Sequence, residues 1–304
     1  MENILMIIMF IGGAVATTIA KLPVTMAGMR IIHSVGATER YAILPRFSLG
    51  LSFTANSGKT CDVIRYDPNN KVMMDVFALK DGKHKGFEFP ANEAQHIINS
   101  FERYNAENEL EIVADFPTKN DMSEYPTDQC FYQILDIRNI LDEEFLYEKH
   151  WSSMSDIRIR RYILNMDTGA GSLYEYPQMW LPNSGLQVEF PFINDHYRGK
   201  EYCFTYFQTM QYDVRVASGL IKVDMCKQTS TGWEEVNKFP VEPVFAARPG
   251  GVAEDDGVIL SPVFDSTTNT TELYIWSAKD LTVLAKLDSP LVVPFTLHGI
   301  WKEG

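Results

Sequence analysis

Six histidines are the residues of this chain with the most versatile chemistry, because a neutral imidazole can bind a metal ion or transfer a proton. Three of them, His33, His96 and His298, lie among apolar residues at or near the ends of strand-like runs. A single histidine is more often a surface or core residue than a ligand, so the apolar surroundings are what make these three candidate metal ligands. The other histidines are His84, in a lysine-flanked loop, and His150 and His196, in polar segments.

Two glutamates are embedded in apolar sequence, where a carboxylate needs a partner. Glu189 lies within residues 188–194 and Glu254 within residues 253–260. Burying an unpaired carboxylate costs several kcal/mol. A metal-bound imidazole carries a proton on its second nitrogen, and a buried glutamate that accepts this proton satisfies both groups. We therefore expect Glu189 and Glu254 to support metal-binding histidines, with an exposed acidic turn at 254–256 as the alternative for Glu254.

Short runs of β-branched and aromatic residues make up the elements that would position these side chains, and they predict an all-β fold. No long amphipathic helix competes with them. Four clear runs lie at 40–44, 110–114, 201–206 and 220–224. Four more follow one another near the C-terminus, at 257–264, 271–276, 281–287 and 291–301. Four consecutive antiparallel strands of this kind predict one propeller blade or one sheet of a sandwich.

An acidic and irregular tract, from Thr118 to Ser155, interrupts the strand pattern. It includes a short helical pattern at 131–146 and predicts an insertion between two strands, of the kind that often shapes a site. No low-complexity linker marks a domain boundary. We therefore expect residues 1–304 to form a single domain that carries an inserted loop and helical region at about 118–155.

The N-terminal segment has two interpretations. Residues 4–20 carry no charge, and Ala14–Ala16 resembles a signal-peptidase site, which would suit a secreted β-sandwich with structural histidines. Against this, Glu2 replaces the positive charge that opens a signal peptide, and Gly12 and Gly13 divide the run into two pieces of strand length. The favoured interpretation is a pair of strands, with a cleaved signal or membrane anchor as the alternative.

The charge balance excludes one class of partner. The chain has 27 Lys and Arg residues against 40 Asp and Glu residues, for a formal net charge of −13, and it has no basic run. A nucleic-acid groove needs concentrated positive charge, so we expect no nucleic-acid partner.

The four cysteines indicate the expected redox environment. They are far apart, lack the spacing of a zinc site and are too few to staple a chain of this length. We interpret them as buried thiols in a reducing compartment and expect a cytoplasmic protein. They are Cys61, Cys130, Cys203 and Cys226.

Short segments along the whole chain share the residue types, order and spacing of a known family. The C-terminal ones are Glu254–Ser261, Ser277–Leu281 and Pro294–Gly299, and the upstream ones are Ile32–Thr38, His96–Glu102, Glu189–Asn194, Gly199–Tyr202 and Glu242–Phe245. Together they resemble blocks of the carotenoid cleavage oxygenase family, which includes β-carotene oxygenases and the retinoid isomerase of the retinal pigment epithelium. One departure is Ile97, which stands where the family has a second histidine.

The resemblance implies a seven-bladed β-propeller with Fe(II) on its axis, held by four histidines and no carboxylate. By motif matching, His33, His96 and His298 fall on the second, third and fourth of those positions. Glu189 and Glu254 fall on two of the glutamates that the family places behind its ligands. This implies that Glu189 pairs with His96 and that Glu254 pairs with His298.

The family's first histidine would lie before Met1. We therefore expect this chain to be the later part of a longer protein, recorded as a fragment or an incomplete gene model. Its propeller would be incomplete and lack the N-terminal blades, which would leave an open flank beside the metal.

The resemblance also implies an activity, an Fe(II)-dependent dioxygenase that cleaves a polyene double bond with O2 to give aldehydes or ketones. The expected partners are a carotenoid or apocarotenoid and O2, with peripheral association with a membrane surface. Residues 4–11 and 47–53 are apolar enough to dock on a membrane, but they fit buried strands better. The alternatives are an inactive fragment or apocarotenoid-binding propeller, and retinoid isomerisation on the same scaffold.

Overall fold

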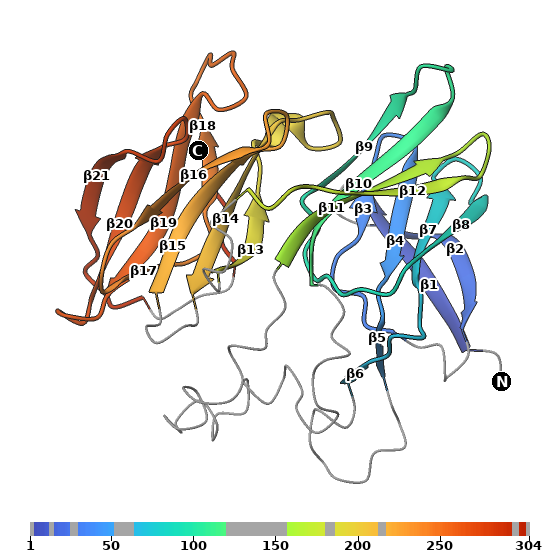
Figure 1. Ribbon diagram of the computed structural model, residues 1–304, viewed down its shortest axis with the longest axis horizontal. Helices are drawn as coiled ribbons and strands as arrows, with labels where there is room; N and C mark the ends of the chain where they lie inside the picture. The colour runs from blue at the N-terminus through green and yellow to red at the C-terminus, as the bar shows by residue number, and fades with distance from the viewer. Residues whose placement is uncertain are drawn as a thin grey trace, which may run out of the picture.

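The computed structural model describes residues 3–11, 15–24, 30–51, 64–119, 157–179, 186–211, 217–293 and 298–301. These residues form β-strands and contain no α-helix, which confirms the all-β prediction (Figure 1). The elements are β1 (Asn3–Ile11), β2 (Val15–Val24), β3 (Gly36–Ala37), β4 (Tyr41–Arg46), β5 (Leu49–Leu51), β6 (Ile64–Tyr66), β7 (Val72–Ala78), β8 (His84–Phe89), β9 (Asn99–Tyr104), β10 (Leu110–Lys119), β11 (Ile157–Asn165), β12 (Gly171–Glu175), β13 (Leu186–Phe192), the 3₁₀ turn η4 (Asp195–Tyr197), β14 (Phe204–Gln211), β15 (Ala217–Asp224), β16 (Thr229–Glu234), β17 (Lys238–Pro240), β18 (Val244–Ala247), β19 (Gly257–Asp265), β20 (Thr270–Ser277) and β21 (Val283–Asp288).

Four antiparallel sheets form the body of the molecule, and we call them the first to fourth blades in chain order. The strand orders are β3-β4-β7-β8, β9-β10-β11-β12 (as β12-β11-β10-β9), β13-β14-β15-β16 and β17-β19-β20-β21, with β18 also paired to β19. Successive strands are neighbours in each blade, which is the meander of a β-propeller. Two smaller pairs, β1-β2 and β5-β6, accompany the blades (Figure 1).

Each core cluster lies between two neighbouring blades. The first and second blades share a cluster that includes Ile43, Val76, Phe87, Ile112 and Tyr162. The second and third share one that includes Phe101, Val113, Val188, Phe207 and Ile221. The third and fourth share one that includes Tyr206, Leu220, Phe245, Ile259 and Trp276.

Strand alternation explains how one blade feeds two cores. Ile112 and Val113 are consecutive in β10, yet each belongs to a different cluster, and the same holds for Tyr206 and Phe207 in β14. Successive side chains of a strand point to opposite faces of the sheet. The strands β10 and β14 of the middle blades are therefore buried on both faces, which fixes each blade against the next.

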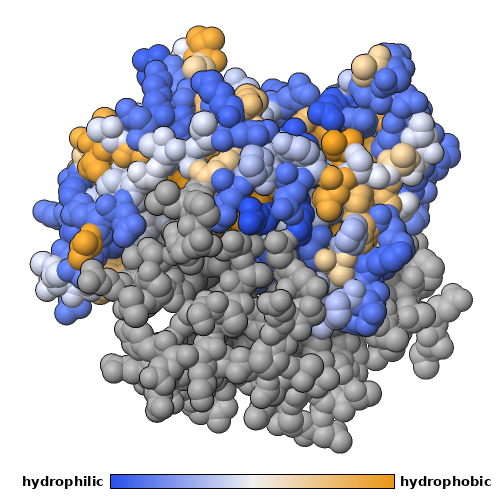
Figure 2. Space-filling model, viewed as in Figure 1, coloured by the Kyte–Doolittle hydropathy of each residue, from blue (hydrophilic) through white to orange (hydrophobic). Residues whose placement is uncertain are grey.

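The described face is mainly hydrophilic, with apolar residues exposed at the outer edge near β21 and in the half of the molecule that holds the first and second blades (Figure 2). Leu284 and Leu287 of β21 are 58% and 51% exposed. In β5 and just before it, Leu49 and Phe47 are buried, as expected for a strand. No helix among the described residues has both the length and the apolar character needed to cross a bilayer.

The N-terminal segment forms the two predicted strands. β1 and β2 pair antiparallel, with Asn3 opposite Val24 and Ile11 opposite Val15. The predicted insertion at 118–155, with its helical pattern at 131–146, lies almost wholly outside the described residues. Its flanks are described: Lys119 at the end of β10 pairs with Ile157 at the start of β11.

The predicted strand at 291–301 is wrong where the structure describes it. Residues 291–293 and 298–301 are not in a strand, and residues 294–297 lie outside the described ranges. The fourth blade instead takes its first strands from upstream, because β17 and β18 in turn pair with the edge of β19. An apolar run can pack against a blade without joining its hydrogen-bonded ladder, and sequence pattern does not separate these cases.

Two of the cysteines are not free thiols. Cys203 and Cys226 form a disulfide, with their Cα atoms 5.1 Å apart. Cys203 precedes β14 and Cys226 follows β15, and these strands are neighbours, so pairing brings the two residues together. The interpretation of Cys203 and Cys226 as reduced thiols is therefore corrected, while Cys61 and Cys130 lie outside the described residues.

Candidate metal centre

The three candidate histidines meet at one point. The Nε2 atoms of His33 and His96 are 3.1 Å apart. The rings of His96 and His298 have centroids 5.2 Å apart and stand nearly perpendicular. One ligand nitrogen from each histidine lies within 4.8 Å of the others. Residues that are far apart in the sequence thus form one cluster, which is the geometry that a shared ligand requires.

The blade edges explain how the cluster forms. His33 precedes β3 and His96 precedes β9, each by three residues, and these are the first strands of neighbouring blades. His298 follows the last strand of the fourth blade, and the backbone N–H of Gly299 is anchored by Glu242 between β17 and β18. All three histidines therefore lie on segments next to first strands, which occupy one edge of each blade.

Glu189 supports His96 as expected. Its Oε2 atom lies 2.8 Å from Nδ1 of His96, and both side chains are 14% exposed. An Nδ1–H that donates to a carboxylate leaves the lone pair on Nε2, the nitrogen that faces His33. The contact fixes the tautomer that a metal ion would need.

The expected pairing of Glu254 with His298 is wrong. Nδ1 of His298 instead lies 3.1 Å from Oε1 of Glu242, and Oε2 of Glu242 accepts a hydrogen bond from the backbone of Gly299. Glu242 stands in the Glu-Pro-x-Phe segment between apolar residues Val241 and Val244. The burial argument that selects Glu189 applies equally there, so the sequence held a signal for it.

Glu254 holds a different part of the chain. Its carboxylate accepts hydrogen bonds from the backbone N–H groups of Cys203 and Phe204. Burial, followed by the nearby charges of Asp255 and Asp224, raises the pKa of Glu254, while the two backbone hydrogen bonds oppose this shift. The carboxylate is therefore partly buried, as argued from its sequence context, but with a backbone partner rather than a histidine.

Phe190 is a residue of the site that the sequence did not single out. Its ring centroid lies 5.1 Å from that of His96 and 5.5 Å from that of His298. It has φ of +54° and sits in a bulge of β13, between Glu189 and Phe192. A left-handed conformation is costly for a residue with a Cβ atom and is held in place by its surroundings. No local pattern marks such a position.

The electrostatics of the cluster favour the neutral imidazole of His33. Burial lowers the pKa of His33, and the neighbouring His96 and His298 lower it further, while Glu189 raises it. A neutral imidazole has a free lone pair and is therefore ready to coordinate. Neutral imidazole ligands do not offset the charge of a bound cation. The nearby carboxylates of Glu189 and Glu242 contact His96 and His298.

The donor set fits a metal ion. A metal–nitrogen bond of about 2.1 Å places adjacent ligand nitrogens roughly 3.0 to 3.4 Å apart, and the Nε2 atoms of His33 and His96 are 3.1 Å apart. Imidazole suits Fe, Zn, Cu and Ni, so the donors alone do not select the element. The side chain of His298 is 55% exposed, whereas that of His96 is 14% exposed.

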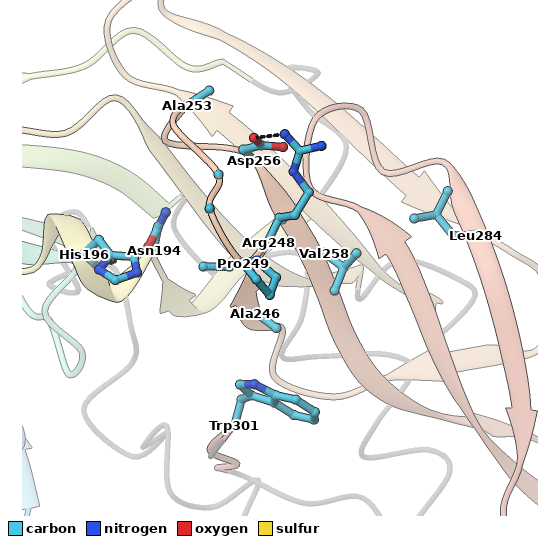
Figure 3. A pocket seen from close by; sticks show the side chains of 14 residues that line it. Asn194, His196, Ala246, Arg248, Pro249, Ala253, Asp256, Val258, Leu284 and Trp301 are labelled. Carbon is cyan, nitrogen blue, oxygen red and sulfur yellow. Dashed lines mark hydrogen bonds and ion pairs between the residues drawn. The ribbon is translucent and has the colours of Figure 1, made fainter. Parts of the chain in front are cut away.

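Two clefts flank the first strands that lead away from the cluster. One has a volume of about 460 Å³ and is lined by residues that follow His33 and His96, together with residues 198–200. The other, of about 920 Å³, runs along β18 between Asn194 and His196 on one side and Trp301 on the other, below the Arg248–Asp256 ion pair (Figure 3). Residues at and beside turn η4 thus line both clefts.

Comparison with known proteins gives a consistent result. The family described as retinal pigment epithelial membrane protein matches residues 7–303. Carotenoid cleavage dioxygenase 8, chloroplastic, of Arabidopsis thaliana is 25% identical over 278 residues, which cover 89% of this chain and 46% of the relative. Apocarotenoid-15,15'-oxygenase of Synechocystis sp. is 25% identical over 287 residues, which cover 92% of this chain and 53% of the relative.

Solved structures agree on the fold. A single-residue variant of the Synechocystis apocarotenoid oxygenase superposes with a TM-score of 0.73 at 21% identity, over 93% of this chain and 55% of that one. The cobalt-substituted form of the same oxygenase gives a TM-score of 0.72 at 21% identity, again over 93% of this chain and 55% of that one. The chain thus spans about half the length of the relatives it matches. Because the family match covers nearly every residue, this chain belongs to the retinal pigment epithelial membrane protein family, to which its carotenoid oxygenase-like motifs also point.

Proposed function

We propose that His33, His96 and His298 bind Fe(II) and that the protein acts in the oxidative cleavage of a carotenoid or apocarotenoid double bond by O2, giving aldehydes or ketones. The observation that carries the proposal is the convergence of the three histidines, with a glutamate at Nδ1 of two of them. The relatives named as carotenoid cleavage dioxygenase and apocarotenoid oxygenase supply the substrate class.

The residues of this chain have defined roles in such a site. Glu189 and Glu242 hold protons on Nδ1 of His96 and His298, so both rings present Nε2 to the ion. The ring of Phe190 covers one side of these two imidazoles and limits the approach of water. The iron, when bound, supplies the redox chemistry that couples O2 to a polyene, which no side chain provides.

The three histidines would fill part of the coordination shell of an iron ion. Non-haem iron oxygenases work with protein ligands on one side of the ion and open positions on the other. Since this chain spans about half the length of its relatives, we propose the metal centre for the chain itself and the complete reaction for the protein that contains it.

The test of the metal centre is anaerobic reconstitution of this chain with Fe(II), measured by metal content, and we expect about one iron per chain. The test of the reaction adds O2 and an apocarotenal to the iron-loaded protein that contains this chain, and we expect loss of polyene absorbance with formation of shorter carbonyl products. His96→Ala should abolish iron retention. His196→Ala is the matched control, because His196 is exposed and its side chain lies outside the cluster.

Each contrary outcome identifies what fails. If the wild-type chain retains no iron, or if the two histidine variants retain it equally, the metal site is rejected. Bound iron with unchanged polyene absorbance in the protein that contains this chain would reject the cleavage reaction and leave the metal site standing. A product of the same mass as the substrate would indicate isomerisation.

A further inference from the structure

In the described structure Glu254 contacts none of the three histidines, yet it joins the third and fourth blades near the strand that carries Glu189. It comes from the loop before β19 in the fourth blade. Its carboxylate accepts hydrogen bonds from the backbone of Cys203 at 2.9 Å and of Phe204 at 2.6 Å. These residues are the entry to β14 in the third blade, so a side chain of one blade fixes the start of a strand in the next.

The same residue also holds the other strand of that pair. The backbone oxygen of Glu254 accepts a hydrogen bond of 2.8 Å from Nδ2 of Asn194, just beyond the end of β13. Residues 193–203 connect β13 to β14, and we call them the 193–203 connection. Glu254 therefore binds both ends of this connection, and we call these contacts the clasp.

The end of β13 that Glu254 holds through Asn194 is also the end where β13 departs from regular pairing with β14. The β13–β14 register is regular up to Glu189 opposite Gln208, then shifts before Phe192 opposite Tyr206. Glu189 and Phe190 lie at this bulge, and they are the residues that contact His96. A bulge disrupts the ladder and bends its strand, so contacts beyond it decide where its side chains point.

The second blade grips the same connection from the other side. The side chain of Asn99 donates to the backbone oxygens of Tyr197 and Lys200 and accepts from the backbone N–H of Gly199. Asn99 follows His96 by three residues. The 193–203 connection is thus anchored in its middle to the first residue of β9, three residues after His96, and at both ends to the fourth blade, which carries Glu242.

We propose that Glu254 is a positioning residue of the metal centre, which acts through the 193–203 connection to hold the bulge that presents Glu189 and Phe190 to His96. The inference rests on the proposed metal binding and adds a distant residue to it. Without the clasp, the end of β13 is free to shift against the fourth blade. His96 and Glu189 would then lose their fixed orientation toward His298.

The experiment titrates the full-length chain with Co(II) under anaerobic conditions and follows affinity and the visible absorption bands of the bound ion, which report coordination geometry. Glu254→Ala should weaken Co(II) binding by about 3- to 10-fold and alter the bands, because direct hydrogen-bond partners of metal ligands contribute about 10- to 100-fold and Glu254 acts through intervening residues. Glu254→Gln should restore most of both, since its side-chain oxygen still accepts from the backbone.

Asp255→Asn is the matched control from the same loop. Asp255 pairs with Lys222 at 2.6 Å and does not touch the 193–203 connection through its side chain. This variant should lower the urea midpoint of unfolding without changing Co(II) affinity or the absorption bands. A purely structural role for the loop would make Glu254→Ala behave in the same way as this control.

Asn194→Ala gives an independent test if Glu254→Ala does not fold. It removes the contact with the backbone of Glu254 and keeps the carboxylate contacts, so it should produce the same spectral change to a smaller degree. Wild-type affinity and bands in the folded Glu254→Ala or Asn194→Ala variant would overturn the inference alone. Absence of Co(II) binding by the wild-type chain would overturn the metal centre, and the inference with it.

Discussion

The two glutamate-supported histidines of the cluster are held in different ways. His96 and Glu189 are both 14% exposed, and the 193–203 connection that follows the bulge is held by contacts from two other blades. His298 is 55% exposed, Glu242 is its main anchor, and the residues that follow include Ile300 and Trp301 at 89% and 55% exposure. One arm of the site thus pairs two partly buried side chains, whereas the other joins an exposed imidazole to a buried carboxylate.

The comparison indicates which hydrogen bonds hold the histidines in their orientation. Desolvated hydrogen bonds are stronger and cannot be replaced by water, whereas an exposed imidazole finds a water partner when its carboxylate is removed. The His96 arm should therefore set the metal affinity, and the His298 arm should adjust it.

The largest expected effect is that of Glu189→Ala. Loss of the carboxylate leaves Nδ1 of His96 in a site with little access to solvent, so we expect metal affinity to fall about 100-fold, at the upper end of effects seen for such partners. Anaerobic Co(II) titration by absorbance measures it. A loss of less than threefold would show that the buried arm is not the stronger one.

Glu242→Ala tests the exposed arm by the same titration. Water can replace the carboxylate at His298, so the expected loss is about 10-fold. Glu242 also accepts from the backbone of Gly299, and this contact is lost as well. An effect equal to or greater than that of Glu189→Ala would reverse the ranking of the two arms.

Phe190 sharpens the comparison because it touches both arms. Glycine adopts positive φ without the steric cost of a Cβ atom. We therefore expect Phe190→Gly to be more stable than Phe190→Ala by about 1 kcal/mol in urea unfolding, the reverse of the usual order within a strand. Equal stabilities would mean that the bulge relaxes to a regular strand when the ring is removed.

The smallest expected effect is a pH dependence at the clasp. The pKa of Glu254 is raised above its ordinary value of 4.5 by burial and by the charges of Asp255 and Asp224. The folded protein therefore binds this proton more tightly than the unfolded chain, and the contribution of Glu254 to stability falls as the pH rises from below 4.5 through the folded pKa. Glu254→Gln has no titrating group at this position, so it removes this pH-dependent contribution to stability.

Urea unfolding between pH 4 and pH 7 measures the difference. The stability of Glu254→Gln relative to the wild type should increase with pH across the window above 4.5 and then level off. A difference that stays constant, or that decreases with pH, would contradict the direction of the shift.

The positions of many strands could be predicted from the local sequence pattern. The strands at 40–44, 110–114, 220–224, 257–264 and 271–276 were predicted close to their observed positions. The predicted strand at 281–287 begins late, at Val283, because Leu281 takes a positive φ in the turn before it. The strand predicted at 201–206 begins at Phe204, since Cys203 is held by the disulfide and by Glu254.

The candidate site was predictable in its residue types and only partly in its pairings. Apolar context selected His33, His96, His298 and Glu189, which the structure brings together. It also selected Glu254, whose actual partners are backbone groups that no side-chain pattern reveals. Metal binding by the cluster stays a proposal until it is measured.

The sequence by itself determined the strand-rich fold and the supply of imidazoles and carboxylates in apolar runs, because alternation and burial are local properties of a chain. Only the tertiary structure decided that Glu242 supports His298, that Phe190 lies against two imidazoles and that Cys203 joins Cys226. Each of these contacts depends on how neighbouring strands and blades are placed relative to one another. That placement is fixed by packing between segments far apart in the chain, and the sequence of one segment does not specify it.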